Sequence, residues 1–342
     1  MKKHLISPPF LPIKRHGKYY NYHSQNSFES HQWLIPSLKM YFEGLFNNKK
    51  RIKSSDLQAW VQEYQGVDRS KELLITWLGH ATMLIQMGGV NILADPIFES
   101  PSFFFPRMLP LGISPALLPA IDAVVISHNH FDHMDESTLH FLHKNHNPLF
   151  LVPEGNKPWF VKRGMDKVEE LTWWETFEFE GIDFTSVPVW HWSQREFFDR
   201  NKTLWCGWVI QSKKDTVLFG GDSAYSQHYF TAIGELFPTI DVAIMPIGPC
   251  DPDESMRKSH MNAQEAGQAF IDCRARYFIP MHWGTFSFGT DFFKTPVERL
   301  ISWWQQNQTV LPPHSLCLNK VGQQFHLAYH KNLYLNMHDQ NR

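Results

Sequence analysis

Short apolar runs rich in β-branched and aromatic residues recur along this chain, and each is bounded by polar or turn-forming residues. Runs of this length and composition predict β-strands. The pair Gly88-Gly89 separates two of the runs and is typical of a hairpin turn. The predicted strands cover residues 74–77, 82–85, 90–94, 123–126, 184–190, 217–221 and 276–281.

Helical segments follow several of these strands. The predicted helices cover residues 136–143, 226–237, 262–272 and 295–305. Strands that alternate with helices, and that end in polar side chains, favour an α/β sandwich in which two sheets pack face to face with helices outside. A chain of 342 residues is long enough for one large domain or two small ones.

The N-terminal region differs from the rest of the chain. Residues 38–45 and residues 57–64 each place apolar side chains on one face of a predicted helix. No metal-ligand motif of the kind found further along occurs in residues 1–70. We therefore expect an N-terminal helical extension over residues 1–70, packed on a body formed by residues 71–342.

A dense group of metal-ligating residue types follows the strand predicted at residues 123–126. The spacing H-x-H-x-D-H brings together His128, His130, Asp132 and His133. In an extended segment, alternation places the first two histidines on the same side of the chain. Neutral imidazoles suit zinc and other borderline transition metals, and the carboxylate adds a charged oxygen ligand. Because packing gives no reason for this spacing, we interpret it as a metal site rather than a histidine-rich surface loop.

Three further candidate ligands follow apolar runs elsewhere in the chain. They are His191, Asp222 and His282, which come after the strands predicted at residues 184–190, 217–221 and 276–281. Each alone is typical of a cap or a turn. Together with the H-x-H-x-D-H loop they make seven ligands, which is enough for two metal ions that share one carboxylate.

These motifs resemble those of the metallo-β-lactamase superfamily. A narrower resemblance rests on W-L-G-H-A-T at residues 77–82, A-D-P-I-F at 94–98, G-D-S-A-Y at 221–225 and H-W-G-T-F at 282–286. In combination they are similar to the N-acylphosphatidylethanolamine-hydrolysing phospholipase D family, over about residues 73–318. The resemblance implies a four-layer αβ/βα sandwich.

The resemblance also implies a role for each ligand. One zinc ion would be held by His128, His130 and His191, the other by Asp132, His133 and His282, with Asp222 between them. Oxygen-reducing di-iron relatives carry glutamate where this chain has His130, so the resemblance favours hydrolysis. Histidine and aspartate also serve manganese and iron, so the sequence does not choose among these metals.

The implied reaction is metal-dependent phosphodiester hydrolysis of the phospholipase D type. A metal-bridged hydroxide would attack phosphorus, and N-acylethanolamine and phosphatidic acid would be the products. Asp132 and Asp222 would take part as ligands of the metals. The resemblance places His260 near the site, where it would assist the leaving group or hold phosphate. A surface histidine at a helix entry is an equal alternative for His260.

Three residues are candidates for substrate contact. Tyr225 either donates a hydrogen bond to substrate or lines the core, and Arg195 is a candidate anion contact. Arg107 lies in residues 101–110, a segment rich in phenylalanine and proline. This segment either contacts acyl chains, with Arg107 on a phosphate, or packs onto the body.

Two residues near the predicted strand ends are expected to support the site. His80, between the first two strands, is predicted to be a buried, hydrogen-bonded turn histidine. Asp95 follows the strand at residues 90–94 and is predicted to orient a ligand histidine.

Composition narrows the function further. The net charge of −2 gives no general basic surface for nucleic acid. The four cysteines are far apart, which predicts free thiols in a reducing compartment. No apolar stretch reaches the length of a membrane span, and the proline-broken N-terminus does not fit a signal peptide. We expect a cytoplasmic enzyme, with peripheral membrane contact consistent with a lipid substrate, and nothing in the sequence excludes an oligomer.

Two alternative functions follow from the same residues. Metallo-hydrolases with these ligands also act on small soluble phosphodiesters, cyclic nucleotides or lactones, and the fold does not determine the substrate. A non-catalytic metal-binding scaffold is the second alternative. It is less favoured because all seven ligand positions carry the expected residue type.

Overall fold

The computed structural model of the protein describes residues 2–4, 8–22, 53–312 and 315–329. These residues form two seven-stranded sheets and a two-stranded ribbon. The strand order in the first sheet is β1 (Lys2–His4), β10 (Glu175–Phe179), β11 (Ile182–Val187), β12 (Gly207–Gln211), β13 (Thr216–Phe219), β14 (Val242–Pro246) and β15 (Tyr277–Met281). The order in the second sheet is β16 (Gln324–His326), β4 (Leu74–Gly79), β5 (Thr82–Met87), β6 (Val90–Ala94), β7 (Ala123–Val125), β8 (Leu149–Pro153) and β9 (Val168–Leu171).

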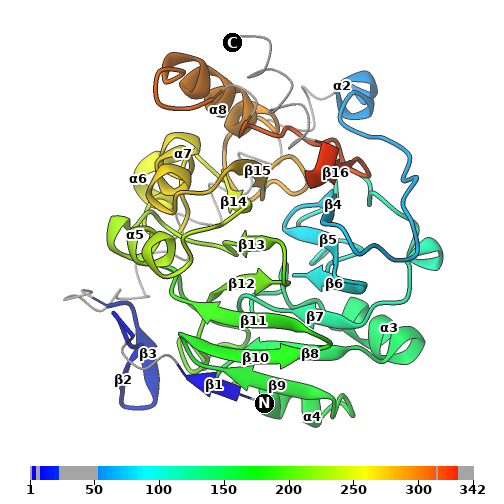
Figure 1. Ribbon diagram of the computed structural model, residues 1–342, viewed down its shortest axis with the longest axis vertical. Helices are drawn as coiled ribbons and strands as arrows, with labels where there is room; N and C mark the ends of the chain where they lie inside the picture. The colour runs from blue at the N-terminus through cyan, green and yellow to red at the C-terminus, as the bar shows by residue number, and fades with distance from the viewer. Residues whose placement is uncertain (1, 5–7, 23–52, 313–314, 330–342) are drawn as a thin grey trace.

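Helices cover the outer sides of the two stacked sheets (Figure 1). Beside the first sheet lie α5 (Gln227–Leu236), α6 (Asp253–Met256), α7 (Ala263–Asp272) and α8 (Thr295–Gln306). Beside the second sheet lie α3 (Glu136–His146) and α4 (Lys157–Val161). This four-layer αβ/βα arrangement confirms the predicted fold class.

The strands have apolar runs because both of their faces are buried. On β5, Met83 and Ile85 belong to the core between the sheets, whereas Leu84 belongs to the outer cluster. Leu139 of α3 and Phe160 of α4 complete that outer cluster. Side chains alternate between the faces of a strand, so a strand covered on both sides is apolar at every position.

The direction of the strands places the predicted ligands at one edge of the sandwich. β6, β7 and β8 are parallel neighbours, as are β13, β14 and β15. Parallel neighbours end at the same edge of a sheet. The loops after β6, β7, β13 and β15 carry Asp95, the H-x-H-x-D-H motif, Asp222 and His282, respectively.

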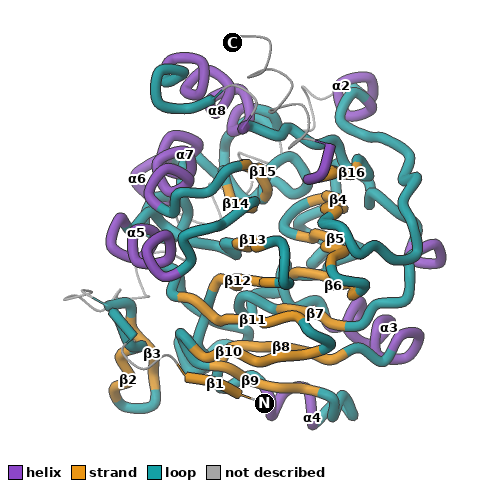
Figure 2. The backbone as a smooth tube through the Cα atoms, viewed as in Figure 1, coloured by secondary structure: helices purple, strands orange, loops and turns teal. Residues whose placement is uncertain are grey.

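Two long connections reach this edge. Most of the chain between β6 and β7 is loop, with one 3₁₀ turn, η2 (Pro115–Leu117), and the chain between β11 and β12 is also irregular (Figure 2). The first connection contains Arg107 and the second contains His191 and Arg195. Long irregular connections of this kind are often functional.

The described part of the N-terminal extension begins with strands, not helices. β1 pairs with β10, and β2 (Ile13–Arg15) pairs with β3 (Lys18–Tyr20) in the small ribbon. After the ribbon, the Tyr22 amide donates to the hydroxyl of Tyr229 at 2.8 Å, and Asn21 Nδ2 donates to the carbonyl of His191 at 2.9 Å. The helix predicted over residues 38–45 lies outside the described residues.

The second predicted N-terminal helix is shorter than expected. α2 (Ser54–Gln58) ends six residues before the predicted end at residue 64. Beyond it, Val61 forms a bridge with Val321, and the Gln62 amide donates to the Val321 carbonyl at 2.8 Å. Pairing with a distant segment therefore replaces the continuation of the helix. The division at residue 70 stays a prediction.

Two features concern the chain as a whole. All four cysteines are buried with free thiols, at positions Cys206, Cys250, Cys273 and Cys317. Among the residues that the structure describes, no helix combines the length and the apolar character needed to cross a bilayer.

Buried tryptophans tie the two sheets to each other through their indole N–H groups. Trp208 on β12 of the first sheet donates from Nε1 to the carbonyl of Ile126, just past β7 of the second sheet, at 2.9 Å. Trp173 likewise donates to the carbonyl of Trp205 at 2.7 Å. The Trp208 bond fixes the backbone two residues before the first histidine of the metal-ligand motif.

We predict that Trp208→Phe lowers the free energy of unfolding by about 2–4 kcal/mol. The substitution leaves the buried Ile126 carbonyl without its donor and removes ring volume from a closely packed core. Urea unfolding measures the difference. Trp303→Phe, at a half-buried position on α8, is the control and should cost less than about 1 kcal/mol. An equal decrease in the free energy of unfolding in both variants would show that the indole hydrogen bond of Trp208 does not contribute measurably to stability.

Candidate metal centre

The seven predicted ligands meet at the edge of the sandwich, although they come from four separate segments. Metal-ligating atoms gather there in overlapping groups, each with its atoms within 4.8 Å of one another. One group is His128, His130 and His191, and another is His80, Asp132, His133 and His282. A third group is Asp222, His260 and His282.

In the first group, three ring nitrogens converge. Nε2 of His128 lies 2.8 Å from Nδ1 of His130, and Nε2 of His191 lies 3.4 Å from that same Nδ1. Neutral imidazole nitrogens without a hydrogen repel one another at such distances. A cation between them would turn this repulsion into attraction.

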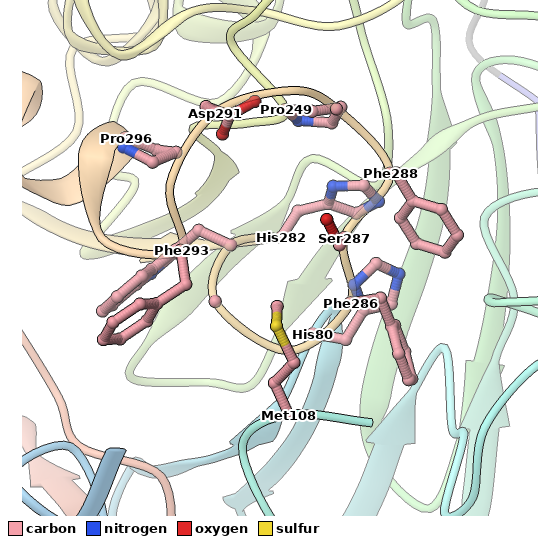
Figure 3. Close-up of a pocket in the computed structure, with 13 residues that line it drawn as sticks. His80, Met108, Pro249, His282, Phe286, Ser287, Phe288, Asp291, Phe293 and Pro296 are labelled. Carbon is pink, nitrogen blue, oxygen red and sulfur yellow. The ribbon is translucent and has the colours of Figure 1, made fainter. Parts of the chain in front are cut away.

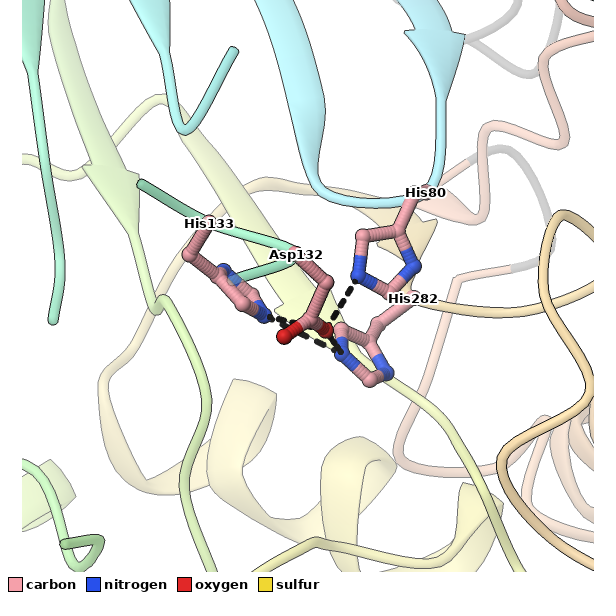
Figure 4. A group of neighbouring side chains, drawn as sticks. All are labelled: His80, Asp132, His133 and His282. Atoms are coloured by element: carbon pink, nitrogen blue, oxygen red, sulfur yellow. Dashed lines mark hydrogen bonds and ion pairs between the residues drawn. The ribbon is translucent and has the colours of Figure 1, made fainter. Parts of the chain in front are cut away.

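The second group lies beside the first. Oδ2 of Asp132 is 3.3 Å from Nε2 of His133 and 3.7 Å from Nε2 of His282. The two histidine nitrogens are 3.3 Å apart. Figure 4 shows the three side chains directed at a common point, with the ring of His80 beside them.

Asp222 spans both groups. Its Oδ2 lies 3.2 Å from Nε2 of His133 and 3.8 Å from Nε2 of His191, while its Oδ1 lies 3.2 Å from Nε2 of His282. One carboxylate therefore reaches a nitrogen of each group. This is the geometry that a shared ligand requires.

Four of the histidines are held by their outer ring nitrogens. A backbone carbonyl only accepts, so a histidine bonded to one through Nδ1 must carry its hydrogen there. Its Nε2 then directs a lone pair at the centre. The four pairs are His191 Nδ1 to the Ser259 carbonyl at 2.8 Å, His282 Nδ1 to the Gly248 carbonyl at 2.9 Å, His133 Nδ1 to Asp95 Oδ2 at 2.7 Å, and His128 Nδ1 to Ser127 Oγ at 2.8 Å.

Several buried polar atoms in the centre have no hydrogen-bond partner. Among them are Oδ1 of Asp222, Nδ1 of His260 and Nε2 of His130. Buried polar atoms are nearly always satisfied in proteins. Unsatisfied atoms beside converging nitrogens and carboxylates fit a site for metal ions.

Burial and mutual charge dominate the electrostatics. Burial lowers the pKa of His191 to about 3 and that of His130 to about 4, which keeps both rings neutral as a ligand requires. Burial alone would raise the pKa of the Asp222 carboxyl, but neighbouring His133 and His282 hold it well below its usual range. Burial lowers the pKa of His282, but Asp222 and Asp132 outweigh it and raise the pKa to about 9, so that without a metal this ring holds a proton whose place a metal ion would take. The buried carboxylates thus attract positive charge.

Asp95 orients part of the loop, as the sequence predicts. It follows β6 with a left-handed φ of 40°. Its carboxylate accepts hydrogen bonds from the Ser127 amide at 2.7 Å, from Ser127 Oγ at 2.5 Å and from His133 Nδ1 at 2.7 Å. It therefore fixes the start of the loop and one ligand together.

His80 does more than the sequence predicts. It is a buried turn histidine between β4 and β5, as expected. Its Nε2, however, lies 2.9 Å from Oδ2 of Asp132, so its ring belongs to the cluster. The signal in the sequence was the string W-L-G-H-A-T, in which His80 is the one residue with an imidazole able to ligate a metal.

His260 also lies at the centre, not on the surface. It precedes α7, and its Nδ1 lies 3.7 Å from Oδ2 of Asp222. Its ring centroid is 5.3 Å from that of His191 and 5.4 Å from that of His282. Of the two alternatives for His260, the structure supports the one near the site.

Arg195 and Tyr225 have other partners. Arg195 donates from Nη1 to the carbonyl of Met134 at 2.7 Å, and its guanidinium stacks on the ring of Phe131 at 4.6 Å. Arg195 therefore holds the end of the loop that carries H-x-H-x-D-H. Tyr225 donates from its hydroxyl to Asp272 on α7 at 2.5 Å.

Arg107 is partly engaged. It donates from Nη2 to the carbonyl of Ile97 at 2.7 Å and stacks on Phe286 at 5.1 Å. Its Nε and Nη1 are buried without a partner. A side-chain carbon added at Gly79 would lie 2.9 Å from Nη1, so this guanidinium lies against the turn that carries His80.

An aromatic pocket adjoins the second group. His80 and His282 line it on one side, and Met108, Phe286, Phe288 and Phe293 are among its other lining residues (Figure 3). The rings form a path outward, because Phe288 lies 5.6 Å from His80 and 4.7 Å from Phe105 between ring centroids. The pocket thus joins the histidines to the phenylalanine-rich segment.

Sequence comparisons place this chain among hydrolases. Residues 90–283 match the β-lactamase superfamily domain. The chain is 34% identical to the mitochondrial N-acyl-phosphatidylethanolamine-hydrolyzing phospholipase D of Saccharomyces cerevisiae, over 66% of this chain and 50% of that protein. It is 35% identical to N-acyl-phosphatidylethanolamine-hydrolyzing phospholipase D 1 of Caenorhabditis elegans, over 67% and 68%. A metal-dependent hydrolase of Methanopyrus kandleri is 30% identical over 66% of this chain and 92% of that protein. The chain thus spans about half the length of the yeast relative.

Solved structures share the fold. A possible metal-dependent hydrolase from Veillonella parvula superposes with a TM-score of 0.60 at 18% identity, covering 75% of this chain and 99% of that one. The metallo hydrolase Igni18 from Ignicoccus hospitalis superposes with a TM-score of 0.56 at 20% identity, covering 74% and 97%.

We predict that Asp95→Asn weakens metal binding by about 10- to 100-fold, because the amide presents a neutral group to His133 and alters its orientation. Competition with a chromophoric chelator measures the affinity. Asp183→Asn on β11, in the first sheet, is the matched control and should leave the affinity unchanged. If both variants bound metal as the wild-type protein does, Asp95 would have no role in the centre.

Proposed function

This chain belongs to the metallo-β-lactamase superfamily of metal-dependent hydrolases, and on that premise we propose that it is a two-metal phosphodiesterase of the phospholipase D type. Its substrate would be N-acylphosphatidylethanolamine or a similar phospholipid, and its products N-acylethanolamine and phosphatidic acid. The observation that carries the proposal is one carboxylate, Asp222, placed between two groups of histidines, four of which are held by their outer nitrogens.

We assign the ligands as the resemblance implies, because the structure brings all seven together. His128, His130 and His191 would hold one ion, Asp132, His133 and His282 the other, and Asp222 would bridge them. Two zinc ions suit this donor set, and manganese or iron suits it as well. When bound, the metals lower the pKa of a water molecule and polarise a phosphate oxygen.

The protein groups supply positioning. Asp132 and Asp222 would hold the metal ions in place as ligands. His260, just before α7, faces Asp222 and would contact the phosphate or the leaving alcohol. Arg107 keeps two unpartnered donors beside the His80 turn and stays the proposed phosphate contact. Arg195 and Tyr225 stay proposed substrate contacts, although Nη1 of Arg195 donates to the Met134 carbonyl and the Tyr225 hydroxyl donates to Asp272.

The lipid substrate rests on two observations. The yeast and worm relatives are named for hydrolysis of N-acylphosphatidylethanolamine. In addition, the segment after β6 exposes Phe103 at 95% and Phe104 at 59%, and its Phe105 contacts the aromatic pocket beside the histidines. Exposed phenylalanines that lead to a reactive centre suit acyl chains. The proposal includes a cytoplasmic location and peripheral contact with a membrane. The yeast relative, by contrast, is named as mitochondrial.

A small soluble phosphodiester, cyclic nucleotide or lactone is the second candidate substrate. The relative in Methanopyrus kandleri is named only as a metal-dependent hydrolase, and it matches this chain over 92% of its own length. The same metal groups would serve either substrate class.

We predict chelator-sensitive release of N-acylethanolamine and phosphatidic acid from N-acylphosphatidylethanolamine in detergent micelles. Asp222→Asn should reduce turnover by at least about 10³-fold without unfolding, because a neutral amide is a poor shared ligand. Mass spectrometry of the lipid products measures the reaction, with bis(p-nitrophenyl) phosphate assayed alongside. Cleavage of the small diester alone would favour the second candidate, and undiminished turnover in the variant would exclude the two-metal mechanism.

We predict that the double variant Phe103→Ser, Phe104→Ser lowers kcat/KM on micellar lipid by about 10-fold, through loss of apolar contact with the micelle. Its rate on bis(p-nitrophenyl) phosphate should not change, since both side chains are exposed to solvent. Phe197→Ser, Phe198→Ser, another exposed pair, on the other long connection, is the control. Equal effects of the first pair on both substrates would indicate a structural role.

A further inference from the structure

We propose that His80 is a positioning residue of the metal centre, which donates a hydrogen bond to Asp132 and directs that carboxylate at the second metal site. The second metal site is defined here as Asp132, His133 and His282. The inference rests on the proposed two-metal centre, but it does not depend on the identity of the substrate.

The contact involves the oxygen that faces the site. Nε2 of His80 lies 2.9 Å from Oδ2 of Asp132. That same oxygen is the one 3.3 Å from Nε2 of His133 and 3.7 Å from Nε2 of His282 (Figure 4). A carboxylate oxygen has two lone pairs, so it can accept from His80 and still present the other lone pair to a metal ion.

His80 gives Asp132 the kind of support that four of the histidines also have. Each of His128, His133, His191 and His282 is held through its outer nitrogen by a group that is not a proposed ligand. Among the described residues, His80 is the one partner that the Asp132 side chain has outside the ligand set. Without it, the orientation of this carboxylate would depend only on the metal and on the neighbouring histidines.

His80 is itself rigidly placed. Its amide donates to Thr285 Oγ1 at 2.7 Å, and its carbonyl accepts from Trp77 Nε1 at 2.8 Å and from the His282 amide at 3.1 Å. The ring packs on Phe286, with centroids 4.9 Å apart. The residue adopts a left-handed φ of 53°, which histidine tolerates better than most residues. A side chain fixed at both backbone groups and at one ring face is suited to hold another.

The arrangement also joins three elements. His80 lies on the β4–β5 turn, Asp132 on the loop after β7, and His282 after β15 of the opposite sheet. The hydrogen bond therefore fixes the position of the loop that carries H-x-H-x-D-H relative to the β4–β5 turn. That turn is itself bonded to the opposite sheet through the His282 amide. We expect its loss to affect the second metal site and to leave the first group of histidines intact.

The test measures metal binding without substrate, in the full-length protein. Metal-free wild-type protein, His80→Ala and His80→Gln are titrated with Co²⁺, and binding is followed by calorimetry, by the visible absorption of the bound ion and by elemental analysis. The amide nitrogen of glutamine can occupy the place of imidazole Nε2 and donate to Asp132. His146→Ala, a half-buried histidine on α3, is the control.

In His80→Ala, we expect one ion to bind as in the wild-type protein and the second to bind about 10- to 100-fold more weakly, with an altered spectrum. His80→Gln should recover the second affinity to within about threefold, and His146→Ala should not differ from wild type. Both His80 variants place a non-histidine residue at the same left-handed position, so the unfolding midpoints of the metal-free variants show whether any loss is one of folding.

Three outcomes would overturn the inference. Wild-type affinity at both sites in His80→Ala would show that Asp132 needs no support. Equal losses in folded His80→Ala and His80→Gln would instead make His80 a direct ligand. A wild-type protein that binds a single ion would leave no second metal site to support. None of these outcomes depends on phospholipase activity. If the protein did not hydrolyse the proposed lipid, the metal titrations would still test the role of His80.

Discussion

The convergence of imidazole lone pairs on buried carboxylates is the constraint on which the rest of this structure depends. Nitrogens of His128 and His130 that lie 2.8 Å apart, and a buried carboxylate such as that of Asp222, are unfavourable unless positive charge lies between them. A protein holds such an arrangement only if the surrounding structure fixes each group. For His128, His133, His191 and His282, hydrogen bonds to the outer ring nitrogens provide that fixation.

The sandwich supplies the anchors because of where its strands end. Parallel neighbours in both sheets finish at one edge, so loops from distant parts of the chain face each other across the interface between the sheets. Trp208 donates a hydrogen bond from the opposite sheet to the backbone of Ile126. Asp95 accepts hydrogen bonds from Ser127 and His133. Arg195 donates to the carbonyl of Met134 in the same loop. The loop that carries H-x-H-x-D-H is therefore held at its beginning and at its end.

Much of the fold could be predicted because its strands are buried on both faces and appear in the sequence as continuous apolar runs. The convergence of the candidate ligands could be predicted because H-x-H-x-D-H has no packing explanation. The end of α2 and the contact of His80 with Asp132 could not be predicted. Pairing of Val61 with Val321 ends the helix, and the bond from His80 to Asp132 joins residues 52 positions apart. Arg195 shows the same limit, since only the fold reveals which carbonyls its guanidinium meets.

The separation of the ligands along the chain has a consequence for biosynthesis. His133 and His282 are 149 positions apart, yet their ring nitrogens meet at 3.3 Å. During synthesis the H-x-H-x-D-H loop emerges long before Asp222 and His282, so the nascent chain presents an incomplete set of ligands. The full set exists only after β15 has joined its sheet. Loading with both metals would therefore mark the completed fold, and an ion captured earlier would meet a different coordination environment.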